Sequence, residues 1–233
     1  MKTLRKAFGI SVCALVLALP ATALEDNATS TRSMEDLMET RREAMQQRRT
    51  EFDERVEQKR EDLETRIEQK RAELKERLRR IRDENKRKIV ERIDRQIDAL
   101  NERLLKHFTG VLNKIEGILS RISDRADRAE SNGSDVSSVR SAITATQDKI
   151  SAARTAIINQ TGKTYTIEVT GEERLKVDVG LVRQALHSDL TRVREVVKAA
   201  RAAARDAATA LAKVKPVRDD LEATSTPETE GEE

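Results

Sequence analysis

Four consecutive segments decide the fold of this chain: EFDERVEQKRE (51–61), DLETRIEQKRA (62–72), ELKERLRRIRD (73–83) and ENKRKIVERID (84–94). Each is 11 residues long, and an apolar residue recurs at every eleventh position from Met34 to Ile122. Eleven residues make three turns of α-helix, so every copy returns its apolar residue to the same face. The repeat predicts a long, charged helical rod over residues 33–96.

The repeat gives this rod a narrow apolar seam. The rest of its surface is Arg, Lys, Glu and Gln, whose i,i+4 pairs support a helix that packs little. A narrow seam with a period of 11 favours a right-handed or nearly straight coiled coil. We therefore predict a protein partner or self-association through the rod, as a homo-oligomer; the alternative is a free-standing single helix. The predicted seam residues are Met45, Phe52, Val56, Leu63, Ile67, Leu74, Leu78 and Ile89.

Apolar residues become denser after residue 97 and form a wide stripe that must be buried. Two further helices, one after Asn132-Gly133 and one from about Gly180, have apolar residues at 3/4 spacing, and Pro216 ends the second. This pattern predicts an antiparallel three-helix bundle over residues 97–216. Gly110 and Gly117 lie seven residues apart on one helix face, which predicts the close approach of a neighbouring helix or, alternatively, a kink.

A small β-hairpin is predicted between the second and third helices of the bundle, near residues 163–179. KTYTIEV (163–169) and RLKVDV (174–179) both alternate apolar and polar residues, and a Gly-containing turn separates them. Two strands alone are marginally stable, so we expect the hairpin to pack on the helices. The predicted fold class is all-α, with the long charged helix continuing into the bundle and with this hairpin added.

Both ends of the chain have their own composition. Residues 1–23 have a basic start, an apolar run and an Ala-Thr-Ala sequence, which predicts a cleaved signal peptide; a retained anchor is the alternative. Residues 24–32 are a predicted flexible linker, and residues 217–233 a predicted disordered acidic tail. The one cysteine lies in the signal, so the exported protein has no disulfide. We expect secretion or a place in the periplasm or cell envelope.

Composition argues against several functional classes. Charged residues make up 37% and aromatic residues 2% of the chain, which leaves little material for a thick core. His107 and His187 are the only histidines, and neither lies at metal-ligand spacing from another ligand. With no catalytic or phosphate-binding motif either, we predict no enzyme activity, no metal and no cofactor.

Nucleic acid and lipid are also poor matches to this sequence. Acidic residues interrupt the basic cluster at residues 77–88, whereas nucleic-acid binding requires a predominantly positive face. Lipid-binding helices need a broad apolar face, and the seam is narrow. We expect no nucleic acid and no membrane contact after signal removal, with lipid association as a minor alternative.

Several short motifs show a resemblance. The chain resembles a family of uncharacterised exported helical proteins from small-genome candidate-phylum bacteria, through its signal, its charged helix, Val179-Gly180 and the stretches IVERID (89–94), KTYTIEV (163–169) and LHSDLTRVREVVKAARAA (186–203). The resemblance implies an exported bacterial protein. That family has no assigned activity, so it implies no functional residue.

Together these patterns predict an exported structural or interaction protein of the cell envelope. In this interpretation a helical stalk presents the bundle or pairs with another chain. The alternative is a periplasmic holdase-type chaperone, and a minor alternative is an amphipathic surface protein.

Overall fold

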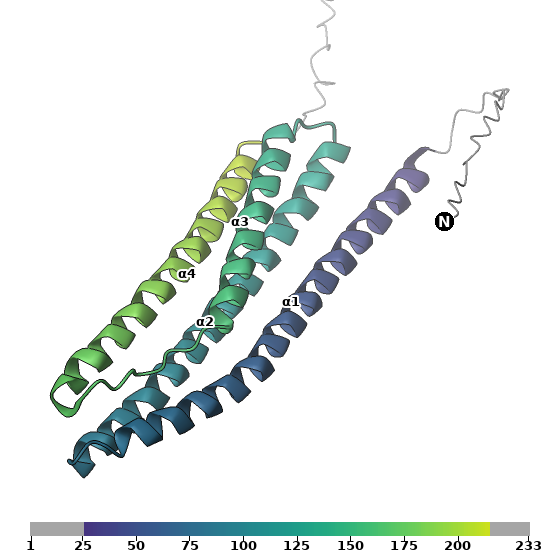
Figure 1. Cartoon of the computed structure of the whole chain (residues 1–233). Coiled ribbons are helices and arrows are strands. Elements are labelled where there is room, and N and C mark those ends of the chain that lie inside the picture. Colours follow the sequence, from purple (N-terminus) through teal and green to yellow (C-terminus); the bar gives the residue numbers. More distant parts are fainter. Residues whose placement is uncertain (1–25, 215–233) are drawn as a thin grey trace, which may run out of the picture.

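The structure is a computed structural model that describes residues 26–214, with side-chain surroundings from residue 35 onward. Its helices are α1 (Asp26–Leu78), α2 (Glu84–Ser131), α3 (Ser137–Thr161) and α4 (Leu175–Ala212), with a short 3₁₀ turn, η1 (Glu172–Arg174), before α4. The four α-helices lie side by side in one elongated bundle (Figure 1). The predicted all-α class is confirmed.

The structure bears on only part of what was predicted for the two ends of the chain. The predicted signal (1–23) and the predicted acidic tail (217–233) lie outside the described residues. The predicted linker (24–32) is wrong for most of its length, because α1 begins at Asp26. None of the described helices combines the length and apolarity needed to cross a membrane.

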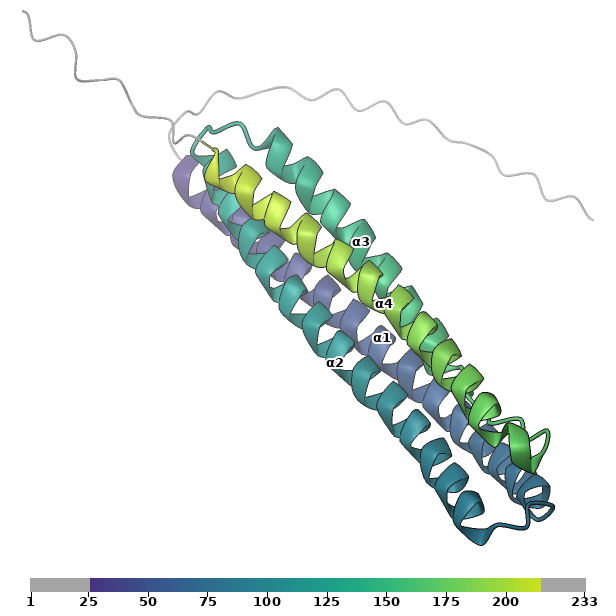
Figure 2. The same ribbon diagram turned by 90° about the vertical axis from the view of Figure 1, so that its left-hand side faces the viewer.

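The continuous rod predicted over residues 33–96 is wrong, because the chain turns back between α1 and α2. The two helices run antiparallel, side by side, and residues 84–96 belong to the same helix as the start of the predicted bundle (Figures 1 and 2). The Asp83 carboxylate caps α2 by accepting hydrogen bonds from the backbone N–H groups of Asn85 (2.8 Å) and Lys86 (3.2 Å). Ile81 is 3% exposed and anchors the turn.

An apolar core joins α2, α3 and α4. α3 runs antiparallel to α2 and α4, which are parallel to each other (Figure 1). Leu112, Val139 and Ile157 are completely or almost completely buried. Buried alanines along α4 let its neighbours approach closely: Ala200, Ala204 and Ala207. Most of the wide apolar stripe of the sequence is therefore buried within the chain, whereas Leu100 and Ile118 are 36% and 41% exposed.

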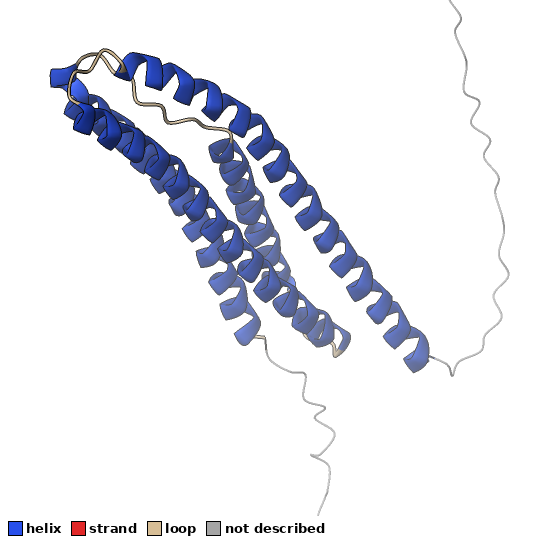
Figure 3. Cartoon of the chain, turned by 90° about the horizontal axis from the view of Figure 1, so that it is seen from below, coloured by secondary structure: helices blue, strands red, loops and turns tan. Residues whose placement is uncertain are grey.

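The predicted β-hairpin does not form, and residues 26–214 contain no strand (Figure 3). Residues 162–171 instead run without regular structure from the end of α3 to the turn between α1 and α2. There Ile167 is 0% exposed and packs with Leu78, Ile81 and Val90. The RLKVDV stretch opens α4, because Leu175, Val179, Val182 and Leu186 also have the spacing of a helix face.

A polar network fixes this irregular segment to three helices. The Tyr165 hydroxyl donates to Asp189 Oδ2 (2.7 Å) and accepts from Gln160 Nε2 (2.7 Å), which also donates to Asn101 Oδ1 (3.0 Å). Burial and the bond to Asp189 raise the pKa of Tyr165. Burial opposes ionisation of Asp189, but hydrogen bonds from Lys163 and Tyr165 outweigh it and lower its pKa. Tyr165 of the KTYTIEV motif therefore attaches the α3–α4 connection to the bundle through hydrogen bonds.

Gly110 and Gly117 face open space. A Cβ atom added at either position would meet nothing within 4 Å. The predicted close approach of a neighbouring helix at these glycines is therefore wrong. Gly133, by contrast, has φ of 80° in the connection between α2 and α3, a conformation that glycine adopts without strain.

Candidate interaction site

The contact between α1 and the rest of the bundle combines apolar seam residues with a series of ion pairs. Arginines along α1 pair with acidic residues along α2. The pairs are Arg41–Asp127 (2.5 Å), Arg42–Asp124 (3.6 Å), Arg49–Glu116 (3.5 Å), Arg71–Asp94 (3.5 Å) and Arg71–Asp98 (2.9 Å). We call this set of five pairs the arginine ladder. Its arginines lie between residues 41 and 71 of α1.

The acidic members of the ladder are much more buried than the arginines. The side chains of Asp94, Glu116 and Asp127 are 7%, 4% and 3% exposed. Desolvation by burial outweighs the charge of the facing arginines and raises the pKa of Asp94, Asp98 and Glu116. The bundle therefore presents α1 with a row of buried acids, two of which also pair with arginines of α3: Asp127 with Arg140 (2.5 Å) and Glu116 with Arg154 (2.5 Å).

The 11-residue repeat also positions the arginines. Arg49, Arg60 and Arg71 are spaced by 11 residues, so they share one face of α1. Arg49 and Arg71 belong to the ladder. Arg60 lines a cavity of about 430 Å³ between α1 and α2, together with the seam residues Leu63 and Ile67. The repeat thus carries a charge pattern as well as an apolar seam.

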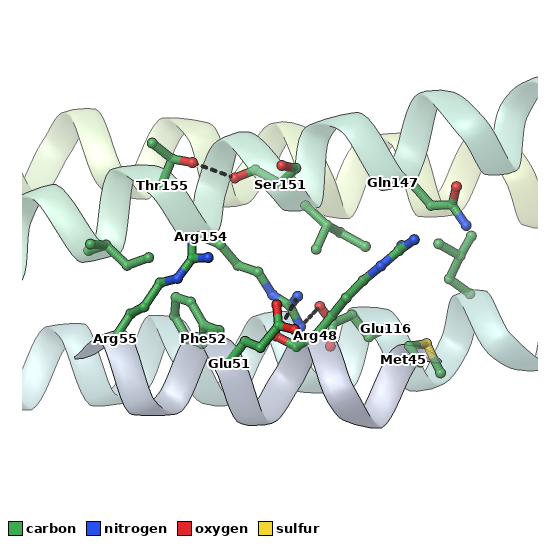
Figure 4. Close-up of a pocket in the computed structure, with 13 residues that line it drawn as sticks. Met45, Arg48, Glu51, Phe52, Arg55, Glu116, Gln147, Ser151, Arg154 and Thr155 are labelled. Carbon is green, nitrogen blue, oxygen red and sulfur yellow. Dashed lines mark hydrogen bonds and ion pairs between the residues drawn. The ribbon is translucent and has the colours of Figure 1, made fainter. Parts of the chain in front are cut away.

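The centre of the interface is a cluster around Glu116 and Arg154, where α1 meets α2 and α3 (Figure 4). Arg154 Nη2 lies 2.5 Å from Glu116 Oε1, and Arg154 Nη1 donates to the carbonyl oxygen of Arg48 (3.3 Å). The Arg154 guanidinium also lies over the Phe52 ring, 5.4 Å from its centroid, in a cation–π contact. Burial lowers the pKa of Arg154.

This cluster is packed less completely than a core. A cavity of about 300 Å³ lies beside it, and Met45 and Phe52 of α1 are among the residues that line it (Figure 4). Arg49 Nε and Arg154 Nε are buried without a hydrogen-bond partner among the described residues. Unsatisfied buried donors reduce what the ion pairs contribute to stability.

The structure places the predicted seam residues unevenly. Phe52, Leu74 and Leu78 are buried against the rest of the chain, and Ile89 is 51% exposed on α2. The remaining seam residues are half-buried: Met45, Val56, Leu63 and Ile67. The seam of α1 is therefore occupied by α2, α3 and the α3–α4 connection of the same chain.

Apolar periodicity did not predict the ionic residues of this interface. Arg49, Arg71, Glu116 and Arg154 hold the interface, and none of them belongs to the seam. One signal was present in the sequence: arginine recurs at 49, 60 and 71 with the period of the repeat. The acids on α2 gave no such signal, because they are spaced irregularly.

A second groove runs between α2 and α4. Its cavity measures about 1,100 Å³, and its apolar lining includes Leu100, Leu104 and Phe108. The titratable side chains that line it are all basic: Arg103, His107, Arg183, His187 and Arg194. The groove therefore combines an apolar floor with a positive rim.

No protein-family model, no curated protein and no solved structure matches the chain. Within residues 35–214, no three His, Cys, Asp or Glu side chains gather where they could hold a metal ion. The functional interpretation therefore depends on the two surfaces described above.

Proposed function

We propose that this chain is an exported interaction protein of the cell envelope, and that the face formed by α2 and α3 binds a helix bearing arginines. In the monomer, α1 occupies this face. The observation that carries the proposal is the arginine ladder, in which buried acids of α2 pair with arginines of one long helix.

The energetics of the two kinds of contact support an exchangeable α1. Within residues 35–78 of α1, only Phe52, Leu74 and Leu78 are buried apolar residues. Replacing a buried ion pair by apolar residues is often neutral or stabilising. Buried ion pairs therefore contribute less binding free energy than apolar contacts of the same area. A partner helix with the same arginine spacing can therefore compete with α1.

A peptide added in trans tests this proposal. In a full-length receptor with Arg49→Glu and Arg71→Glu, the chain's own α1 is repelled from Glu116, Asp94 and Asp98. We expect a labelled peptide of residues 35–78 to bind this receptor saturably, and more weakly at high salt. The control peptide carries the same two glutamates and is expected to bind at least tenfold more weakly.

Circular dichroism of the receptor establishes that the bundle stays helical, so that a negative binding result can be interpreted. Equal binding of the two peptides, or no binding of the native peptide to a folded receptor, would refute the proposal.

A second candidate function, a periplasmic holdase-type chaperone, is favoured by the groove between α2 and α4. Its apolar floor and positive rim suit exposed apolar segments flanked by acidic residues. The full chain should then suppress aggregation of an unfolded outer-membrane protein, and a Leu100→Ser/Leu104→Ser variant should lose most of this effect. Absence of suppression at stoichiometric excess removes this candidate.

A further inference from the structure

We propose that two copies of this chain exchange α1, so that each α1 docks on the α2/α3 face of the other copy and continues directly into its own α2 as one helix. This inference rests on the proposed function, because it names a second copy of the chain as the partner of the arginine ladder. Exchange of an identical element between protomers repeats the contacts of the closed monomer. The two forms therefore differ mainly in residues 79–83.

The hinge sequence is compatible with a continuous helix. Residues 79–83 read Arg-Arg-Ile-Arg-Asp and contain neither glycine nor proline, and arginine is among the better helix formers. The 11-residue repeat also crosses the hinge in phase, because Ile67, Leu78, Ile89 and Leu100 keep the same spacing. Because the spacing of 11 residues is the same on both sides of the turn, a continuous helix through residues 79–83 would keep these apolar residues on one face.

The interactions that close the hinge are few and local. Asp83 caps α2, and Ile81 packs in the apolar cluster at this end of the bundle. Glu172 accepts hydrogen bonds from the backbone N–H of Arg82 (2.9 Å) and from Lys86 Nζ (2.9 Å). Opening the hinge breaks these contacts and leaves the five pairs of the ladder to re-form between copies.

Exposed apolar residues lie at the hinge end of the bundle, where the two copies would cross. Ile89, Val177 and Leu181 are 51%, 51% and 60% exposed. α2 and α4 both begin at this end (Figure 1). Ile89 is the member of the repeat that directly follows the hinge, and in the monomer about half of its surface stays exposed. A second copy whose helix crosses here supplies the cover that the monomer lacks.

Isotope-resolved crosslinking of the full chain tests the exchange. An Arg71→Lys variant keeps the charge and places an amine opposite Asp98, which Arg71 contacts at 2.9 Å. Unlabelled and ¹⁵N-labelled copies are refolded together at high concentration, separated by size and treated with a zero-length carbodiimide crosslinker. We expect crosslinks between positions 71 and 98 in the dimer to include peptide pairs of different isotope beside pairs of the same isotope, and crosslinks in the monomer to join peptides of the same isotope alone.

A hinge variant gives the direction of the effect. Asp83→Ala removes the cap of α2 and favours helix through the hinge, so the dimer-to-monomer ratio should rise about fivefold per cap lost. The matched control is Asp62→Ala, at an exposed position of α1, and it should leave the ratio unchanged.

Two results overturn the exchange: same-isotope crosslinks throughout the dimer, or a monomer at every concentration for both the parent chain and Asp83→Ala. If the native peptide nevertheless binds the Arg→Glu receptor described above, the proposed function stands and only the identity of the partner is wrong. If that peptide also fails to bind, both fall.

Discussion

α2 contacts α1 along one side and α3 and α4 along the other, and the two contacts differ in kind. On the α3/α4 side, Leu112, Ile115 and Leu119 are buried in a continuous apolar core. On the α1 side, buried acids meet partly exposed arginines, and cavities of about 300 and 430 Å³ remain. One helix thus contributes both to a continuous apolar core, beside which the groove between α2 and α4 lies open, and to an interface in which buried acids meet arginines.

This difference suggests that the two contacts have different roles, one in stability and one in the choice of partner. Apolar burial contributes free energy in proportion to area, so the contact of α2 with α3 and α4 supplies most of the stability. Ion pairs contribute less net energy but demand a partner of matching charge. We therefore expect the core to set the stability of the bundle and the ladder to select which helix covers the α2/α3 face.

The largest effect is expected from a cavity in the core. Leu112→Ala removes a side chain that is 1% exposed and should lower the free energy of unfolding by about 2–5 kcal/mol. Chemical denaturation followed by circular dichroism measures this change. A loss below about 1 kcal/mol would mean that α2 depends on its core contact no more than on α1.

Removing the central acid of the ladder should have the next largest effect. Glu116→Ala leaves Arg154, whose side chain is 14% exposed, without its ionic partner, at a cost of about 3 kcal/mol. The control is Glu116→Leu combined with Arg154→Leu, which removes both charges and should cost much less. If the double variant is as unstable as the single one, the pair stabilises the fold in its own right.

Substitution of the two open glycines should stabilise α2 without changing its contacts with the neighbouring helices. Gly110→Ala and Gly117→Ala add methyl groups that meet nothing within 4 Å, so each should raise the free energy of unfolding by about 0.5–1 kcal/mol. Because these residues contact neither interface, the opening of α1 should stay unchanged. Destabilisation would show that the outer face of α2 is covered in solution.

The smallest effect is a pH dependence that separates the two regions. The raised pKa values of Asp94, Asp98 and Glu116 mean that the folded chain binds more protons than the unfolded chain just above the ordinary carboxyl pKa of about 4. Their contribution therefore favours folding at mildly acidic pH and is lost as the pH rises through the raised values.

Asp189 has the opposite sign. Its pKa is lowered, so its contribution is present above the ordinary value and is lost as the pH falls below about 4. Denaturation measured across the pH range, with an Asp94→Asn/Glu116→Gln variant, checks both windows. In the variant, the free energy of unfolding should fall less as the pH rises through the raised pKa values of the acids on α2. Its loss of stability below about pH 4 should be unchanged, and a smaller loss there would contradict this assignment.

The sequence predicted the helices well, and the connections between them poorly. Long runs with 3/4 spacing identified α3 and α4, since nothing in residues 137–161 or 181–212 competes with helix formation. The turn at residues 79–83 was missed because its signals are a single capping aspartate and the burial of Ile81, which depends on distant residues such as Ile167. The hairpin was predicted because RLKVDV alternates apolar and polar residues. Leu175 and Val179 of this alternation also fit the spacing of a helix, and the structure forms the helix.

The interaction site was predictable only in part. Period-11 spacing located the face of α1 that is covered, and Phe52, Leu74 and Leu78 are buried there. Its partner was not predictable, because the acids that face α1 come from a helix that the sequence pattern joined to α1 end to end. The arginines acquire their role only when the chain folds back.

Hydrogen exchange measured by mass spectrometry tests most directly whether α1 is separable from the bundle. We expect the amides of residues 37–70 to exchange through a local opening, well before the buried amides of α2, α3 and α4. Arg71→Gln, which removes two ladder contacts, should speed this opening about tenfold, whereas Lys75→Gln, at an exposed position of the same helix, should not. Exchange of α1 together with the bundle, in one global unfolding event that Arg71→Gln and Lys75→Gln affect equally, would contradict a separable α1.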